Sequence, residues 1–107
     1  MDSLDAMYYG LLGKFSAQPG KRDELVEHLL RAAELLKTNP GCLHYVVSTS
    51  DDPDAVWVWE VWVDNEAHAA SLEPEGIRAL IQQGRPLIAG MSDQNELIVH
   101  GGKGRPL

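Results

Sequence analysis

Apolar and polar positions along the chain form blocks that predict strands and helices in turn. Residues 8–15 (YYGLLGKF) are rich in Tyr, Leu and Phe and precede a Pro-Gly pair, which predicts a first strand. Between Lys21 and Lys37, apolar residues recur at helical spacing until Asn39-Pro40-Gly41 stops the pattern. The apolar stripe of this predicted helix is Leu25, Leu29, Ala32 and Leu36, widened by Val26, Leu30 and Ala33.

A hairpin is predicted after the long helix. Residues 42–50 (CLHYVVSTS) and 55–63 (AVWVWEVWV) have the length and composition of strands. The segment 51–54 between them, Asp-Asp-Pro-Asp, favours a tight turn. The second of these strands is almost continuously apolar, so we expect both of its faces to be covered.

Two short helices are expected after the hairpin. Asp64 suits the N-cap of a helix over residues 65–71. A second helix is predicted to begin near Glu73, with Pro74 in its first turn. The buried stripe of that second helix is Ile77, Leu80 and Ile81.

A linker over residues 86–93 and a last strand over residues 95–100 complete the predicted elements. Their order is the βαββαβ pattern of a ferredoxin-like α+β fold with an antiparallel sheet. We expect this domain to span residues 8–100, after a disordered or frayed extension over residues 1–7. The Gly-rich residues 101–107 form either a flexible tail or a lid.

The third predicted strand has two different faces. Alternation places Trp57 and Trp59 on one face and Glu60 and Trp62 on the other. The predicted helices can cover one face only, and Trp57 and Trp59 in water would form a patch typical of an association site. We therefore predict a homodimer with these two tryptophans in its interface.

Gly10 and Gly13 are unusual residues for a strand, because glycine has no side chain to pack. They indicate either that another group approaches the backbone closely or that the strand is twisted or bulged. The residues alone leave both explanations open.

Composition and charge narrow the function classes. The 107 residues suffice for one hydrophobic core, and a net charge of -7 makes nucleic acid and membrane surfaces poor partners. The single cysteine, Cys42, predicts a reducing, cytoplasmic compartment. No apolar run approaches the ~20 residues of a membrane helix, and the N-terminal residues lack the features of a secretory signal.

Several kinds of site are not expected. The common phosphate, dinucleotide, zinc and acyl-transfer motifs are absent from the sequence. No two of the four histidines (His28, His44, His68 and His100) share the close spacing of ligands on one face, so no metal site is predicted.

Glu60 is the charged residue that most needs an explanation, because it interrupts an otherwise apolar strand. A buried carboxylate must find a partner or take up a proton. Glu60 is therefore either a general base or polar anchor in a pocket, or the member of an ion pair or hydrogen bond at the sheet edge.

Three nearby residues are candidates for the same pocket. Trp62 shares a face with Glu60 and forms either a pocket wall or core packing. His68 either points back over the pocket as a donor or proton shuttle, or is an exposed helix residue. His44 and Tyr45 lie on opposite faces of their strand, so at most one of them joins the pocket.

Four segments, PGKRDEL, NPGCLHY, EVWVDNEAHAASL and ALIQQGRPLI, resemble the antibiotic biosynthesis monooxygenase family in order and in spacing. The resemblance covers about residues 8–100. It implies a dimeric α+β barrel in which two ferredoxin-like sheets pack face to face, with a pocket between sheet and helices. Characterised members include cofactor-independent monooxygenases of phenols or quinols, haem-degrading enzymes and an isomerase of a signalling sugar.

The resemblance also implies roles by position. Trp62 matches the pocket tryptophan of the family, His68 falls about where polyketide-oxidising members have a functional tyrosine, and Val58 takes the place of their asparagine. The haem-degrading members use an asparagine and a histidine at positions held here by Gly13 and about Ile81, so haem degradation is not expected.

The leading hypothesis is a monooxygenase without a cofactor that oxidises a small quinol or phenolic aromatic with molecular oxygen. His68 or Glu60 would remove the phenolic proton. The predicted substrate contacts are Trp62, Val58, Tyr45 and Ile81. Two alternatives stay open: a non-enzymatic dimer that binds a small metabolite, and an isomerase or lyase of a small oxygenated metabolite.

Overall fold

The computed structural model describes residues 7–104. The predicted N-terminal extension therefore lies outside the described residues except for Met7, and so do the last three residues of the predicted tail. Residues 101–104 are exposed and form neither helix nor strand.

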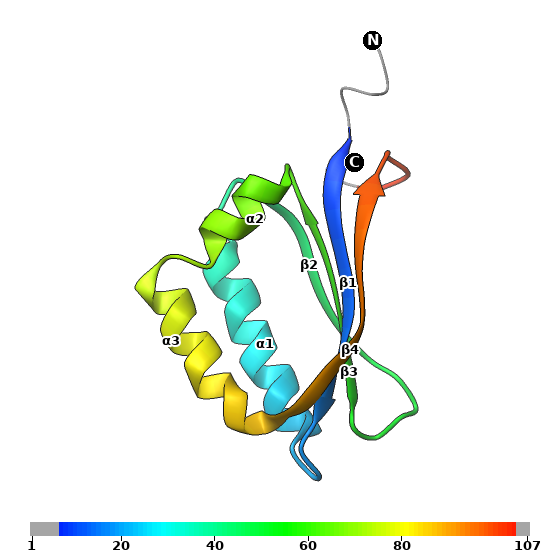
Figure 1. Cartoon of the computed structure of the whole chain (residues 1–107), viewed down its shortest axis with the longest axis vertical. Helices are drawn as coiled ribbons and strands as arrows, with labels where there is room; N and C mark the ends of the chain where they lie inside the picture. Colours follow the sequence, from blue (N-terminus) through cyan, green and yellow to red (C-terminus); the bar gives the residue numbers. More distant parts are fainter. Residues whose placement is uncertain (1–6, 105–107) are drawn as a thin grey trace.

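The chain folds into one sheet with helices on one side. In chain order the elements are β1 (Tyr8–Ala17), α1 (Arg22–Leu36), β2 (Cys42–Thr49), β3 (Ala55–Trp62), α2 (Asn65–Ser71), α3 (Glu75–Gly84), the short 3-10 helix η2 (Arg85–Leu87) and β4 (Ile88–Val99). The strands pair antiparallel in the order β2-β3-β1-β4. Figure 1 shows all three α-helices on one face of the sheet and none on the other. The prediction of a ferredoxin-like α+β fold is confirmed.

The last strand is longer than predicted. Residues 88–93, expected to be a linker, belong to β4, which pairs with β1 from Ala17↔Ile88 to Tyr8↔Val99. The strand forms because β1 supplies backbone partners along its whole length, although the residues of β4 are mostly polar and exposed.

The two glycines of β1 both mark a close approach. A Cβ at Gly10 would lie 2.8 Å from Val99 and 3.0 Å from the ring of Trp59. At Gly13 a Cβ would lie 2.3 Å from the side-chain amide of Gln94. The β1–β4 register also shifts here, so that Asp93 and Gln94 oppose the single residue Gly13. Asp93 accordingly has a positive φ of 53°.

Strand β3 supplies most of the buried apolar residues, and helix α1 packs against the sheet with a stripe close to the predicted one. Leu25 and Leu29 pack with Val56, Val58 and Ala17 of the sheet. Leu30, which was predicted to widen the stripe, is 49% exposed. His28 is buried in its place, because α3 packs along that side of α1.

The contact between α1 and α3 depends on His28. Its Nε2 donates a hydrogen bond to the carbonyl oxygen of Leu80 at 2.5 Å, and Arg31 approaches its Nδ1 at 3.3 Å. Gly84 lies against the same ring, where a Cβ would be 2.8 Å away. At the other end of α3, Pro74 is the extended N-cap residue rather than part of the first turn as predicted.

The helix-free face of the sheet carries apolar side chains. Trp57 and Trp59 are half-buried there, with Lys14 Nζ 5.9 Å from the centre of the Trp57 ring. Val46 and Leu97 lie on the same face and are 45% and 40% exposed. None of the helices within residues 7–104 is long and apolar enough to cross a membrane.

Candidate functional site

A cavity of about 600 Å³ lies between the sheet and the helices. Its wall is mostly apolar and comes from β1, α1, α3 and β4 as well as the hairpin; representative residues are Leu11, Phe15, Leu29, Leu80, Ile88 and Met91. An apolar cavity with a few polar groups is the usual form of a small-molecule site.

Most of the predicted site residues meet in this cavity. Its wall contains Glu60, His68, Val58, Tyr45 and Ile81. Trp62 is not part of the wall and is only 1% exposed, so it does not occupy the stacking position that was predicted for it. Trp57 and Trp59 lie on the opposite face of the sheet, as alternation along β3 requires.

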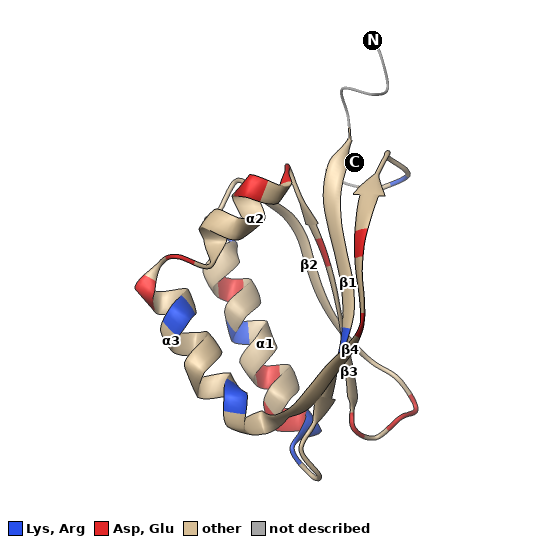
Figure 2. Cartoon of the chain, in the orientation of Figure 1, with Lys and Arg blue, Asp and Glu red and all other residues tan. Residues whose placement is uncertain are grey.

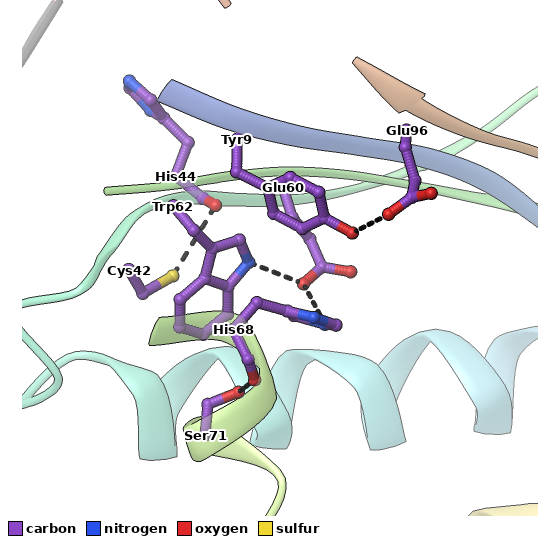
Figure 3. A network of polar contacts seen from close by, with 8 residues as sticks. All are labelled: Tyr9, Cys42, His44, Glu60, Trp62, His68, Ser71 and Glu96. Carbon is purple, nitrogen blue, oxygen red and sulfur yellow. Dashed lines mark hydrogen bonds and ion pairs between the residues drawn. The ribbon is translucent and has the colours of Figure 1, made fainter. Parts of the chain in front are cut away.

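Glu60 is held at one end of the cavity by Trp62. In the sheet Glu60 pairs with Leu11 on one side and Tyr45 on the other. The indole Nε1 of Trp62 donates a hydrogen bond to Glu60 Oε1 at 3.0 Å, as Figure 3 shows. Burial raises the pKa of Glu60, and the hydrogen bond from Trp62 opposes this by favouring the carboxylate.

His68 reaches the same carboxylate from α2. Its Nε2 lies 3.9 Å from Glu60 Oε1, and the two side chains are 22% and 18% exposed. Helix α2 is fixed at its start by Asp64, whose carboxylate accepts a hydrogen bond from the amide of Ala67 at 2.7 Å. Of the two readings of His68, the cavity position is the one found.

Two aromatic rings enclose the imidazole of His68. The ring of Trp62 lies edge-on at 5.3 Å between centroids, and the ring of Tyr9 is tilted at 5.8 Å. Burial lowers the pKa of His68, and the nearby carboxylate of Glu96 opposes this shift. The neutral imidazole is therefore favoured, and that form can accept a proton.

Tyr9 and Glu96 were not singled out from the sequence. The hydroxyl of Tyr9 donates to Glu96 Oε2 at 2.6 Å, and partial burial together with this bond raises the pKa of Tyr9 to about 12. Tyr9 pairs with Trp62 across β1 and β3. The signal for this grouping is strand register, which a single sequence does not specify.

Tyr45, and not His44, is the residue of β2 that joins the cavity. Burial and the charge of Glu60 raise the pKa of the Tyr45 hydroxyl, which keeps it protonated and able to donate a hydrogen bond. The carbonyl oxygen of His44 accepts a contact from Cys42 Sγ at 3.6 Å.

The resemblance assigns the asparagine and the histidine of haem-degrading members to Gly13 and about Ile81. Gly13 and Ile81 both line the cavity, and neither has a side chain that binds iron. His28 lines it too, but its Nε2 is engaged by Leu80. Within residues 7–104, no group of three or more His, Cys, Asp or Glu side chains is placed to hold a metal ion.

The family model of antibiotic biosynthesis monooxygenase matches residues 8–83, which include Glu60, His68 and most of the cavity wall. The chain belongs to the antibiotic biosynthesis monooxygenase family. The resemblance stated from the four sequence segments is thus confirmed, although β4 lies beyond the matched residues.

A solved structure agrees with the membership in this family, and others at lower identity share the fold. A protein from Chloroflexus aurantiacus assigned as an antibiotic biosynthesis monooxygenase is 45% identical, with a TM-score of 0.83, over 92% of this chain and 97% of that one. One from Caulobacter crescentus, similarly assigned, is 21% identical with a TM-score of 0.73, over 90% and 91% of the chains. None of the curated proteins compared matches significantly.

A third structure shares the fold at lower identity. It is a variant of SnoaB, described as a cofactor-independent oxygenase from Streptomyces nogalater, at 16% identity and a TM-score of 0.70 over 94% of this chain and 98% of that one. At this identity the likeness establishes the fold alone.

Proposed function

We propose that this protein is a cofactor-independent monooxygenase that oxidises a small quinol or phenolic aromatic with molecular oxygen. The observation that carries the proposal is the pairing of Glu60 with His68 in a mostly apolar cavity of about 600 Å³. Family membership supports oxygenase chemistry, and the description of SnoaB supports the absence of a cofactor.

The proposed reaction begins with proton removal. The neutral imidazole of His68 accepts the proton of a phenolic hydroxyl, which leaves an electron-rich phenolate in an apolar site. The substrate then reduces oxygen itself: a hydroquinone loses two hydrogen atoms and gains one oxygen atom, and the second oxygen atom leaves as water. Tyr45 donates a hydrogen bond to the substrate oxygen, and Val58 and Ile81 contact the ring.

Trp62 has a different proposed role from the one first expected. Its indole bonds Glu60 and packs against His68, so it positions both groups from behind the cavity wall. Haem degradation is not proposed, because Gly13 and Ile81 stand where the resemblance implies the asparagine and the histidine of the haem-degrading members.

We also propose that the protein acts as a homodimer. The helix-free face exposes Val46 and Leu97 beside Trp57 and Trp59, and a second copy of this face would cover them. The substrate and oxygen enter the cavity on the opposite face of each sheet. A cytoplasmic location stays a prediction from the single cysteine.

Oxygen uptake with 1,4-dihydroxynaphthalene tests the proposed reaction. We expect protein-dependent uptake in air, with a hydroxylated quinone as product, and a loss of about a hundredfold in kcat/KM for His68→Ala, the usual contribution of a general base. His100→Ala removes an exposed histidine outside the cavity and serves as the control.

Uptake equal to the protein-free rate would contradict the oxygenase proposal. Ligand binding without uptake would then favour the binding-protein alternative, and conversion of a substrate without oxygen would favour an isomerase or lyase. Stoichiometric hydrogen peroxide would indicate an oxidase instead.

A further inference from the structure

Arg85 is a basic residue of the cavity wall, and it is exposed to solvent. It is the one lysine or arginine among the cavity-lining residues that the structure describes. Arg85 is the C-cap of α3 and the first residue of η2. The ion pairs found within residues 7–104 use Lys14, Lys21, Arg22, Lys37 and His68 as the cations, and none uses Arg85.

Arg85 and Glu60 belong to different ends of the cavity. Strand β1 pairs with Glu60 at Leu11 and with Ile88, three residues after Arg85, at Ala17. Six residues of a strand extend about 20 Å. Leu11, Gly13 and Phe15 line the cavity in order along β1, which gives it a length of at least about 13 Å. The cavity is therefore elongated, with Glu60 and His68 at one end and Arg85 toward the other.

We infer that the substrate is an aromatic acid whose hydroxyl lies at Glu60 and His68 and whose carboxylate lies at Arg85. The placement of the hydroxyl rests on the proposed function. The apolar wall between the two ends suits fused aromatic rings, and a guanidinium binds a carboxylate through two parallel hydrogen bonds.

The charge of the whole chain opposes such a ligand, so a local cation favours its binding. The net charge is -7, so the overall field repels anions. Figure 2 shows acidic residues in the β2–β3 loop and in the connection between α2 and α3, whereas basic residues occur on α3 and at its end. Arg85 also complements the negative end of the α3 dipole, but that role does not require a place in the cavity wall.

Calorimetric binding of two matched probes under nitrogen tests the inference. The probes are 6-hydroxy-2-naphthoate and its methyl ester, which differ in charge but little in shape. We expect Arg85→Gln to weaken binding of the acid about tenfold or more and to change binding of the ester less than about twofold. Arg85→Lys, which keeps the charge but loses the two parallel hydrogen bonds, should bind the acid with an affinity between those of the wild type and Arg85→Gln.

Arg78→Gln is the control, because Arg78 is an exposed residue of α3 outside the cavity wall. It should bind both probes as the wild type does. Salt should reduce the difference in acid affinity between the wild type and Arg85→Gln and leave the ester unaffected.

Equal affinity of wild type and Arg85→Gln for the acid overturns the inference, and so does failure of the wild type to bind the acid. Because these probes are phenols measured without oxygen, the result does not depend on turnover. If the ester binds tightly and Arg85→Gln does not change the affinity for the acid, the inference about Arg85 fails and the proposed oxygenase is unaffected. If the acid binds in a way that depends on Arg85 but the protein takes up no oxygen, only the proposed oxygenase is refuted.

Discussion

Burial shifts the pKa values of Glu60 and His68 in opposite directions. It raises the pKa of the carboxyl and lowers that of the imidazole. In each case the neutral form loses less hydration free energy on burial than the charged form does. The hydrogen bond from the indole of Trp62 stabilises the charged form of Glu60. A carboxylate beside a neutral imidazole suits proton transfer.

Glu96→Gln tests how the surroundings set the protonation of His68. The Glu96 carboxylate favours the imidazolium, so removing its charge should lower the pKa of His68 further. Nuclear magnetic resonance titration of the His68 ring should detect this shift. If His68 is the base, the acid limb of the activity profile should move to lower pH in the same direction, because the neutral form then persists to lower pH.

Glu27→Gln is the matched control, since Glu27 is an exposed carboxylate on α1. An unchanged or raised His68 pKa in Glu96→Gln would show that Glu96 does not act on the imidazole. Tyr9→Phe adds a second comparison, because it removes the hydrogen bond to Glu96 and keeps the ring beside His68.

At the scale of elements, the contact between α1 and α3 forms part of the cavity wall. His28 of α1 bonds the carbonyl of Leu80 in α3, and Gly84 allows its ring to lie against the helix backbone. Both His28 and Gly84 also line the cavity. Packing between the helices and shape of the site are therefore set by the same residues.

Gly84→Ala should destabilise the protein by about 1–3 kcal/mol, because a Cβ at 2.8 Å from His28 forces that ring to move. Thermal unfolding should show a lower Tm. Gly76→Ala lies in the same helix with nothing within 4 Å, so it should instead stabilise by up to about 1 kcal/mol. In a His28→Ala background the loss caused by Gly84→Ala should disappear, and its persistence would refute the clash.

At the scale of the whole molecule, the two faces of the sheet have different surroundings. One face is covered by the helices and holds the cavity, whereas the other leaves Val46 and Leu97 exposed beside Trp57 and Trp59. Burial of such a face between two copies would remove apolar area from water on both, which is the main driving force for association.

The proposed dimer predicts a mass in solution of about twice 11.8 kDa. Trp59→Glu should yield monomers, since a buried carboxylate without a partner is costly. Leu30→Glu places the same charge at an exposed position on α1 and should leave the dimer intact. Sedimentation equilibrium measures the mass in solution of the wild type and of both variants. A monomeric wild type at micromolar concentration would contradict the proposed dimer.

The sequence by itself determined the order of elements, the position of α1 and the two faces of β3. These features follow from local propensity and from the periods of helix and strand, which act between residues close in the chain. It also brought Glu60 and His68 together as candidates, because a charged residue in an apolar strand is visible without any fold.

Only the tertiary structure decided the features that depend on partners distant in the chain. Pairing with β1 extended β4 back to Ile88, and packing of α3 buried His28 and left Leu30 in water. Strand register brought Tyr9 and Glu96 close to His68. Trp62 is buried and does not line the cavity. The physical reason is that register and helix packing are fixed by contacts over many residues, which the local pattern does not specify.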